Sequence, residues 1–421
     1  MSQPDSSPHH SGPPTRGQAR PAVTGPRWAR LSIVALISFG LLARLALAFV
    51  VGESRAGGWP QAREYLEIAQ SVVQGQGLRS PGGLATRMPG YPLVLVAADA
   101  TGHTLRALAV FQSVCGAAAM VLALVMAWRL DGVWAGLVAA ALLAFDAYQV
   151  YLAGIVIPQV PLGLALAAAV LAGLVFLEAA ERPGWRRWIW AAVAGAALAA
   201  AAYLDAVLAG LAVAAGLAAV VSRWRRRLLA GWAVGAAVML AALAPWMVRN
   251  AVCLGRPVLT TDLGLRLYEG TQSDCEKPDG RYSPDTVSRQ AQGLGEVGRD
   301  VLYLESAAGR VAEDPAGWLG RVGRRAGGMW CPASGANDWL PLSAAGYTSL
   351  VPALVLGLAG VWAMRRRREM LVWLLLGPAY VTVAGGLLCG GALDRIAVMP
   401  ALAVLGGVGV AAVLQRQHVH V

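Results

Sequence analysis

The chain alternates long apolar stretches with shorter polar ones along almost its whole length. A helix needs roughly 20 mainly apolar residues to cross the hydrocarbon core of a bilayer. By this measure the pattern predicts ten membrane-spanning helices, at about residues 31–51, 105–128, 132–148, 160–180, 188–205, 206–222, 228–246, 347–364, 370–388 and 396–414. We therefore expect an all-α polytopic membrane protein.

Every second connection between these spans is short and basic. The arginines concerned are Arg129, Arg182, Arg186, Arg187, Arg223, Arg225, Arg226, Arg227, Arg365, Arg366, Arg367 and Arg368. Cytoplasmic loops of membrane proteins collect Lys and Arg, so these connections and both termini are predicted to be cytoplasmic. The alternate loops then face outward, and two of them are long, at residues 52–104 and 247–346.

The first long loop has a clear helical pattern. Apolar residues recur at intervals of three and four, which is typical of an amphipathic helix, and two glycines then end it. The apolar positions are Tyr65, Leu66, Ile68, Ala69, Val72 and Val73, and the glycines are Gly75 and Gly77. A loop and a rigid turn at Pro89-Gly90-Tyr91-Pro92 are expected to follow.

The second long loop also contains helical stretches, at residues 303–325, interrupted at Asp314-Pro315. Trp318, Leu319 and Val322 fall on one face and arginines on the other. This pattern fits a helix that lies in the membrane interface, and it fits a surface helix of a small soluble subdomain equally well.

Composition agrees with a membrane protein. Of the 421 residues, 57% are hydrophobic and 14% are charged, against about 25% charged in a typical soluble domain. The net charge of +11 comes from arginine runs between apolar spans rather than from one basic face, which argues against nucleic-acid binding. Residues 1–28, rich in Ser, Pro, His and Gly, are expected to be a disordered basic tail before a transmembrane domain at 29–421. Arg44 lies inside the first span and should face protein or water.

Motifs for metal or nucleotide chemistry are missing from the sequence. The five cysteines have no CxxC spacing, although Cys275 and Cys331 share one predicted loop and could pair. The five histidines do not cluster with metal-ligand spacing. No P-loop, Rossmann glycine pattern or Gly-x-Ser-x-Gly motif occurs.

Polar residues gather near the outward ends of several spans. They are Asp146, Gln149, Gln159, Asp205, Arg249, Asn250, Asp394 and Arg395. Ionisable groups at membrane depth are often functional, but each of these residues could also be an ordinary solvated helix end.

Five segments, in order, resemble the C-class (GT-C) membrane glycosyltransferases, which include protein mannosyltransferases and lipid A aminoarabinose transferases. The segments are EYLEIAQSVVQGQG with RMPGYP (64–77 and 87–92), PWMVRN (245–250), GRPVLTTDLGLRLYEG (255–270), DPAGWLGRVGRRAGGMW (314–330) and DRIAVMP (394–400). The resemblance covers nearly the whole chain after the tail. It implies an outward cavity, between the loops and the bundle, that binds a sugar on a polyprenyl phosphate.

The same resemblance implies roles for individual positions, and several of them carry an unexpected residue. Gln61 stands where the family has a first-loop carboxylate, and Gln159 where it has a second acid. Asp205 replaces an arginine suited to phosphate and would repel a phosphate unless a divalent metal lay between them.

An amide cannot accept a proton, so Gln61 could orient an acceptor but not act as a base. Glu64 and Glu67 lie close by on the same predicted helix, and Glu53 precedes it, so the base could have moved by one helical turn.

Further substrate-binding positions are expected within the matching segments. Arg87, Arg249 and Arg395 are candidate phosphate ligands; alternatively they pair with Asp262 or Asp394, or extend to the interface. The remaining candidates are Tyr65, Tyr91, Asn250, Tyr268 and Asp394.

The leading hypothesis from the sequence is a glycosyltransferase of the bacterial plasma membrane that uses a polyprenyl-phosphate-linked sugar. Two alternatives stay open: an inactive protein of the same fold that binds a lipid carrier, and a transporter or flippase of lipid-linked substrates. The absence of an internal repeat weighs against the transporter.

Overall fold

The computed structural model describes residues 27–56, 60–80, 82–179, 184–272, 286–331, 342–391 and 393–417. Within these residues the regular elements are helices, and no strand is formed beyond an isolated bridge between Ser80 and Gly83. Most of the predicted tail at 1–28 lies outside the described residues. The prediction of an all-α polytopic membrane protein is confirmed.

Among the described residues, seven helices are long and apolar enough to cross a membrane. They are α1 (Arg27–Ala56), α4 (Thr104–Ala144), α6 (Gln159–Ala179), α7 (Arg186–Leu204), α9 (Arg225–Leu254), α15 (Arg368–Leu387) and α16 (Met399–Gln417). Helix α4 holds two of the ten predicted spans, joined at Asp131 and Gly132, whose backbone is not helical. The two other predicted spans correspond to η1 with α8 (Ala206–Ala209 and Gly210–Val221) and to α14 (Leu342–Met364), whose apolar stretches are shorter, at Ala206–Val221 and Ser349–Met364.

Arg44 shows how the bundle accommodates a charge at membrane depth. Its side chain is fully buried, and its guanidinium donates to the Gly40 and Leu143 carbonyls at 2.9 Å each. The side chain of Gln149 accepts a third bond, at 3.5 Å. The prediction that Arg44 faces protein is therefore confirmed, and these bonds link α1 to α4 and to α5 (Ala147–Leu152).

The interior of the bundle is built from small residues that allow helix backbones to approach closely. Helices α4, α14 and α16 share a core of Ala, Leu, Val and Met side chains. On the other side of the bundle, Gly195 of α7 faces Gly235 of α9, where an added Cβ would stand 2.1 Å from the Gly235 carbonyl oxygen. Glycine at this crossing is therefore required by the approach of the two backbones.

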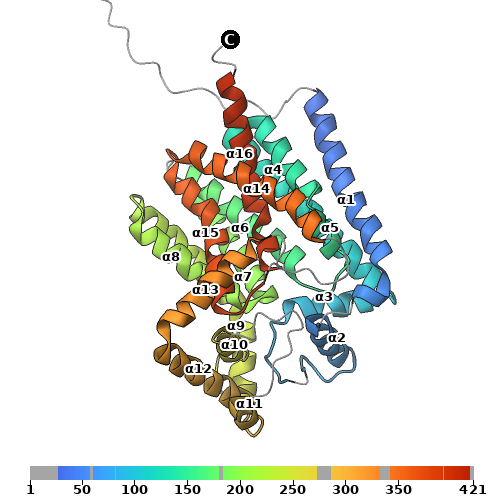
Figure 1. Ribbon diagram of the computed structural model, residues 1–421, viewed down its shortest axis with the longest axis vertical. Helices are drawn as coiled ribbons and strands as arrows, with labels where there is room; N and C mark the ends of the chain where they lie inside the picture. The colour runs from blue at the N-terminus through green and yellow to red at the C-terminus, as the bar shows by residue number, and fades with distance from the viewer. Residues whose placement is uncertain are drawn as a thin grey trace, which may run out of the picture.

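The two long loops gather at one end of the bundle, which we call the loop end (Figure 1). They contribute α2 (Pro60–Val73), α3 (Gly90–Asp99), α10 (Leu263–Gly270), α11 (Thr286–Ala291), α12 (Glu296–Glu313) and α13 (Pro315–Met329). The carboxyl-terminal part of α16 is at the opposite end (Figure 1). The long-loop segments that the sequence singled out thus meet in space.

Local predictions in these loops are largely confirmed. Helix α2 ends before Gly75 and Gly77, which both have positive φ, and it buries Tyr65, Ile68 and Ala69. The break at Asp314-Pro315 separates α12 from α13, because the Asp314 side chain caps α13 by accepting from the Gly317 amide. The turn predicted at residues 89–92 is wrong: α3 begins at Gly90, and Pro92 fits because the first turn of a helix needs no amide donor there.

The α7–α9 crossing gives a test of the packing. Gly195→Ala should lower the thermal stability of the detergent-solubilised protein, with overpacking costs of about 1–3 kcal/mol. Gly327→Ala on α13 is the matched control, since an added Cβ there meets nothing within 4 Å. Equal melting temperatures for the two variants would contradict the close approach.

Candidate functional site

A cavity of about 510 Å³ opens at the loop end, between the two long loops and the ends of α7, α8 and α15. One part of its wall is apolar and includes Val383, Ala384 and Leu387 of α15. The polar part carries Tyr65, Arg87, Asp205, Asp262, Arg266, Asp300 and Tyr380. Three of the residues expected from the sequence, Tyr65, Arg87 and Asp205, thus line one cavity.

The charged residues form a chain of alternating sign, which we call the ion-pair chain: Glu64, Arg87, Asp262, Arg266 and Asp205. Arg87 Nε donates to Glu64 Oε2 at 2.8 Å, and its Nη1 lies 3.5 Å from Asp262 Oδ2. The same Asp262 oxygen accepts from Arg266 Nε at 2.7 Å. Arg266 Nη1 then reaches Asp205 Oδ1 at 3.7 Å. Asp262 is therefore shared between the two arginines.

Local structure explains how these side chains meet. Asp262 and Arg266 are four residues apart at the start of α10, so they lie on the same helical face. The Thr261 amide donates to the Ala85 carbonyl at 2.9 Å, which brings Arg87 beside them. Asp205 interrupts two apolar helices with an extended backbone and accepts from the Val207 amide.

The electrostatics keep both arginines charged. Burial acts to lower the pKa of Arg266, but the Asp262 and Asp205 carboxylates outweigh it and raise that pKa. For Arg87, burial again lowers the pKa, and Tyr65 and the nearby carboxylates outweigh it, so the net shift is upward. Both guanidinium groups therefore remain cationic in a confined cavity.

Burial raises the pKa of Tyr65 from its ordinary value of about 10 to about 12, so its hydroxyl keeps its proton even in alkaline solution. The Arg87 guanidinium lies 5.7 Å from the Tyr65 ring centroid, within cation–π range. Tyr91 is farther inside: its ring meets Tyr65 edge-on at 5.0 Å, and it shares a hydrogen bond of 3.3 Å with Gln112. Tyr65 thus faces the cavity while Tyr91 supports it from behind.

The other expected first-loop residues divide between the two faces of α2. Gln61 and Glu67 are exposed and do not line the cavity. Glu64 does not line it either, but it forms an ion pair with Arg87, which does. The structure therefore brings only one of these three candidates to the ion-pair chain.

Arg249, Asn250 and Tyr268 are placed next to the cavity rather than in its wall. Arg249 Nη1 and Nη2 donate to the Leu84 and Leu78 carbonyls at 2.8 and 3.2 Å. Asn250 is fully buried and donates to the Val258 carbonyl at 2.8 Å. Tyr268 is also fully buried, and the Arg310 guanidinium both donates to its hydroxyl and stacks on its ring.

Gln159, Asp394 and Arg395 do not line the cavity wall, but Asp394 lies close enough to Asp205 and Arg266 to interact with their charges. The Gln159 amide donates to the Asp394 carboxylate, which also accepts from the Gly391 amide at 3.1 Å. Arg395 is buried, donates to the carbonyls of Met329 and Cys331, and lies over the Tyr148 ring. These side chains tie η3 (Asp394–Val398) to the end of α13.

Sequence reasoning missed Arg266, Asp300 and Tyr380. The spacing of Asp262 and Arg266, four residues apart inside a segment already singled out, is the signal that could have found Arg266. Asp300 of α12 accepts from the Gly264 amide at 2.6 Å, and burial raises its pKa. Its contact with α10 depends on the path of the second loop, which periodicity does not specify.

A divalent metal is not supported by the donor set of the cavity. The described residues contain no group of three or more His, Cys, Asp or Glu side chains that could hold one. The cation beside Asp205 is Arg266, so Asp205 has a charge partner without a metal.

The disulfide pairing differs from the Cys275–Cys331 bond that the sequence suggested. Cys389 is disulfide-bonded, whereas Cys331 takes part in no disulfide. The suggested bond between Cys275 and Cys331 is therefore wrong at Cys331, and Cys275 itself lies outside the described residues.

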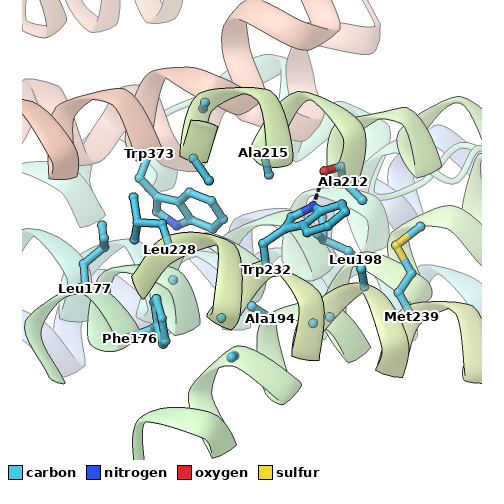
Figure 2. Close-up of a pocket in the computed structure, with 18 of the residues that line it drawn as sticks. Phe176, Leu177, Ala194, Leu198, Ala212, Ala215, Leu228, Trp232, Met239 and Trp373 are labelled. Carbon is cyan, nitrogen blue, oxygen red and sulfur yellow. Dashed lines mark hydrogen bonds between the residues drawn. The ribbon is translucent and has the colours of Figure 1, made fainter. Parts of the chain in front are cut away.

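Two apolar hollows follow the cavity along α8 and α15. The first, of about 30 Å³, is lined by Leu211 and Gly377, and the second, of about 90 Å³, by Trp232 and Phe176. Figure 2 shows the Trp232 and Trp373 rings in this second hollow, where Trp232 Nε1 donates to the Ala212 carbonyl at 2.7 Å.

On both helices, nearby residues line the cavity and the two hollows in succession. On α15, Tyr380 lines the cavity, Gly377 the first hollow and Trp373 both hollows. On α8, Gly210 lines the cavity and Ala215 both hollows. We call this series the apolar track.

Comparison with known proteins finds likeness at the level of structure. No family model matches the chain, and no curated protein matches it. The oligosaccharyltransferase AglB from the archaeon Archaeoglobus fulgidus, in complex with an inhibitory peptide and a dolichol-phosphate, superposes with a TM-score of 0.56 at 14% identity, covering 94% of this chain and 52% of AglB. The chain has the GT-C fold.

Other solved structures of this fold are also similar. The apo form of the Archaeoglobus oligosaccharyltransferase gives a TM-score of 0.53 at 13% identity, covering 92% of this chain and 51% of that one. ArnT from Cupriavidus metallidurans bound to undecaprenyl phosphate gives 0.40 at 18% identity, covering 93% and 79%. This chain spans about half the length of the oligosaccharyltransferases it matches.

Because Asp262 pairs with both Arg87 and Arg266, its loss is expected to lower the stability of the folded protein. Asp262→Asn removes the anion from two partly buried arginines, so the free energy of unfolding should fall by about 2 kcal/mol. Chemical denaturation in detergent measures it, and Glu305→Gln, an exposed carboxylate on α12, is the control. A loss no larger than that of the control would show that the ion-pair chain does not hold the loops together.

Proposed function

We propose that the protein is a membrane glycosyltransferase that moves a sugar from a polyprenyl-phosphate donor to an acceptor at the outer face of a bacterial plasma membrane. One observation carries the proposal: a charged cavity with two arginines lies at the head of an apolar track in a GT-C fold. The ligand that suits such a site has an anionic head and a long apolar tail. A polyprenyl phosphate has both.

Arg87 and Arg266 are the proposed phosphate ligands. Guanidinium groups bind phosphate oxygens through paired hydrogen bonds. Each guanidinium has five N–H donors, which is more than its contacts with Glu64 and Asp262 (Arg87) or with Asp262 and Asp205 (Arg266) use. Their side chains are 20% and 26% exposed, so they are open to a ligand in the cavity. Arg249 and Arg395, whose guanidinium groups are bonded to backbone carbonyls, would act by holding the walls.

The apolar track is the proposed path of the polyprenyl chain. Its lining along α8 and α15 is almost wholly apolar, and it begins next to Tyr380, whose hydroxyl donates to the Val207 carbonyl at 2.5 Å. Burying apolar surface there would stabilise a long chain more than a short one, by about 25 cal/mol per Å² buried.

Asp205 is the proposed proton acceptor. Its Oδ1 contacts the Val207 amide and Arg266, which leaves Oδ2 for a substrate, and the side chain is 28% exposed. The acceptor hydroxyl or amine would give its proton to Asp205 and bond to the anomeric carbon while the bond from that carbon to the phosphate oxygen breaks. Polyprenyl phosphate would leave with the bonding electrons, its charge held by Arg87 and Arg266. Inversion at the sugar is the pattern of the family that the sequence resembles.

The orientation in the membrane follows from charge. With the short arginine-rich connections in the cytoplasm, both termini are cytoplasmic and the loop end faces outward. The cavity would then meet a donor in the outer leaflet.

Transfer assays in liposomes test the site. Arg266→Gln should weaken donor binding, and Asp205→Asn should lower kcat by about 10²–10⁴-fold, the usual contribution of a general base. Gln61→Ala and Glu67→Gln are matched controls, because both residues are exposed and lie outside the cavity wall. Full activity in Asp205→Asn would remove its assignment as base.

Donors of different chain length test the apolar track. Ala215→Leu narrows both hollows, so it should weaken the binding of undecaprenyl phosphate more than the binding of farnesyl phosphate. Val213→Leu, on the exposed face of the same helix, should alter neither affinity. An equal loss for both ligands in Ala215→Leu would mean that the chain does not follow this path.

A second function is favoured by one feature. Gln61 is an amide at the position where the family resemblance implies a carboxylate, and this fits a lipid-carrier-binding protein without transferase activity. Donor binding without transfer, over a broad panel of hydroxyl and amine acceptors, would support it. Donor-independent passage of a lipid-linked substrate across the liposome bilayer would instead support a transporter.

A further inference from the structure

A carboxylate from the second long loop accepts hydrogen bonds from backbone amides of the first long loop. Glu296, the first residue of α12, accepts from the Leu84 amide through Oε2 at 2.6 Å and from the Ala85 amide through Oε1 at 2.8 Å. Thr261 Oγ1 donates to the same Oε1 at 2.5 Å. A single carboxylate therefore binds two successive backbone amides that are more than 200 residues away in the sequence.

The first loop is shaped to receive this carboxylate. Gly83 has φ of +152°, and an added Cβ there would stand 2.3 Å from the Glu296 carboxyl carbon. A larger residue at this position would be strained and would collide with the carboxylate. The start of α12 also favours a negative side chain, because the helix dipole is positive at its amino-terminal end.

Neighbouring contacts hold the same short segment from other sides. Arg299 of α12 donates to the Gly82 carbonyl. Arg249 of α9 donates to the Leu84 carbonyl at 2.8 Å, and the Ala85 carbonyl accepts from the Thr261 amide at 2.9 Å. We call residues 82–85 with these partners the loop clamp.

We infer that Glu296 is a positioning residue that fixes the direction of Arg87 in the cavity. Arg87 follows the clamped amides by two residues, and its guanidinium then has to meet Glu64 on α2 and Asp262 before α10. These partners stand on different loops, so the backbone of residues 84–85 must be fixed for one side chain to reach both. The inference rests on the proposed function only where substrate binding is concerned, because the position of Arg87 can be measured without a ligand.

Glu296→Gln tests the inference against Glu305→Gln, an exposed carboxylate on the same helix. An amide group keeps one acceptor oxygen and turns a donor toward the second backbone N–H, so the clamp should loosen. In hydrogen exchange by mass spectrometry, the peptide that holds Leu84 and Ala85 should exchange at least tenfold faster.

Phenylglyoxal should modify Arg87 several times faster, with exposed Arg63 as the internal reference. Binding of undecaprenyl phosphate should weaken about tenfold, and Glu305→Gln should match the wild type in all three.

Gly83→Ala provides an independent variant that leaves Glu296 intact and should reproduce the three changes. Glu296→Asp, which keeps the charge on a shorter arm, should recover part of the loss. Unchanged exchange in Glu296→Gln would overturn the clamp. Faster exchange with unchanged Arg87 reactivity would reduce Glu296 to a structural tether and overturn the positioning role. If the wild type binds no undecaprenyl phosphate, the proposed function fails, while exchange and Arg87 reactivity still decide this inference.

Discussion

The site depends on one carboxylate, Asp262, that is shared by two partly buried arginines from different loops. Two guanidinium groups confined in one cavity repel each other, and they are stable there only because an anion stands between them. Asp262 Oδ2 supplies that anion, and Glu64 and Asp205 neutralise the outer sides. The ion-pair chain therefore joins α2, α10 and the break after α7 into one charged surface.

The bundle supports this surface through features that a membrane imposes. Breaking a helix at membrane depth exposes backbone groups that must be satisfied within the protein. At the break after α7, Asp205 satisfies the Val207 amide and Tyr380 satisfies the Val207 carbonyl. The same two side chains line the cavity, so the groups that make the break tolerable also form the polar wall. The apolar track continues from them between α8 and α15, where the apolar lining suits a hydrocarbon chain rather than a charged group.

The sequence predicted well whatever depends on local pattern. Span positions, the end of α2 at two glycines and the break at Asp314-Pro315 follow from periodicity and turn chemistry. Burial of Arg44 followed from the cost of a charge in lipid. The role of residues 89–92 was mispredicted because Pro and Gly both begin helices and form turns, and the two uses have the same sequence pattern.

The candidate site was harder to predict because it is built from contacts between distant segments. Tyr65, Arg87 and Asp205 were recognised, whereas Arg266 was not, because its place in the site depends on a contact with Asp205, which lies in a distant stretch of chain. Likewise nothing in the run Leu84-Ala85 indicates that its amides bind Glu296, since backbone donors carry no signature in the sequence. Gln61, which the family resemblance had made central, is on the exposed face of α2.

The most direct test of the account is photocrosslinking with a polyprenyl phosphate that carries a diazirine near its phosphate, followed by peptide mapping. If Arg87 and Arg266 hold the phosphate, crosslinks should fall on the cavity wall, at Val383, Ala384 or Leu387, and excess undecaprenyl phosphate should abolish them. Crosslinks spread over lipid-facing residues such as Val34 of α1 or Leu358 of α14, with no competition, would contradict the account.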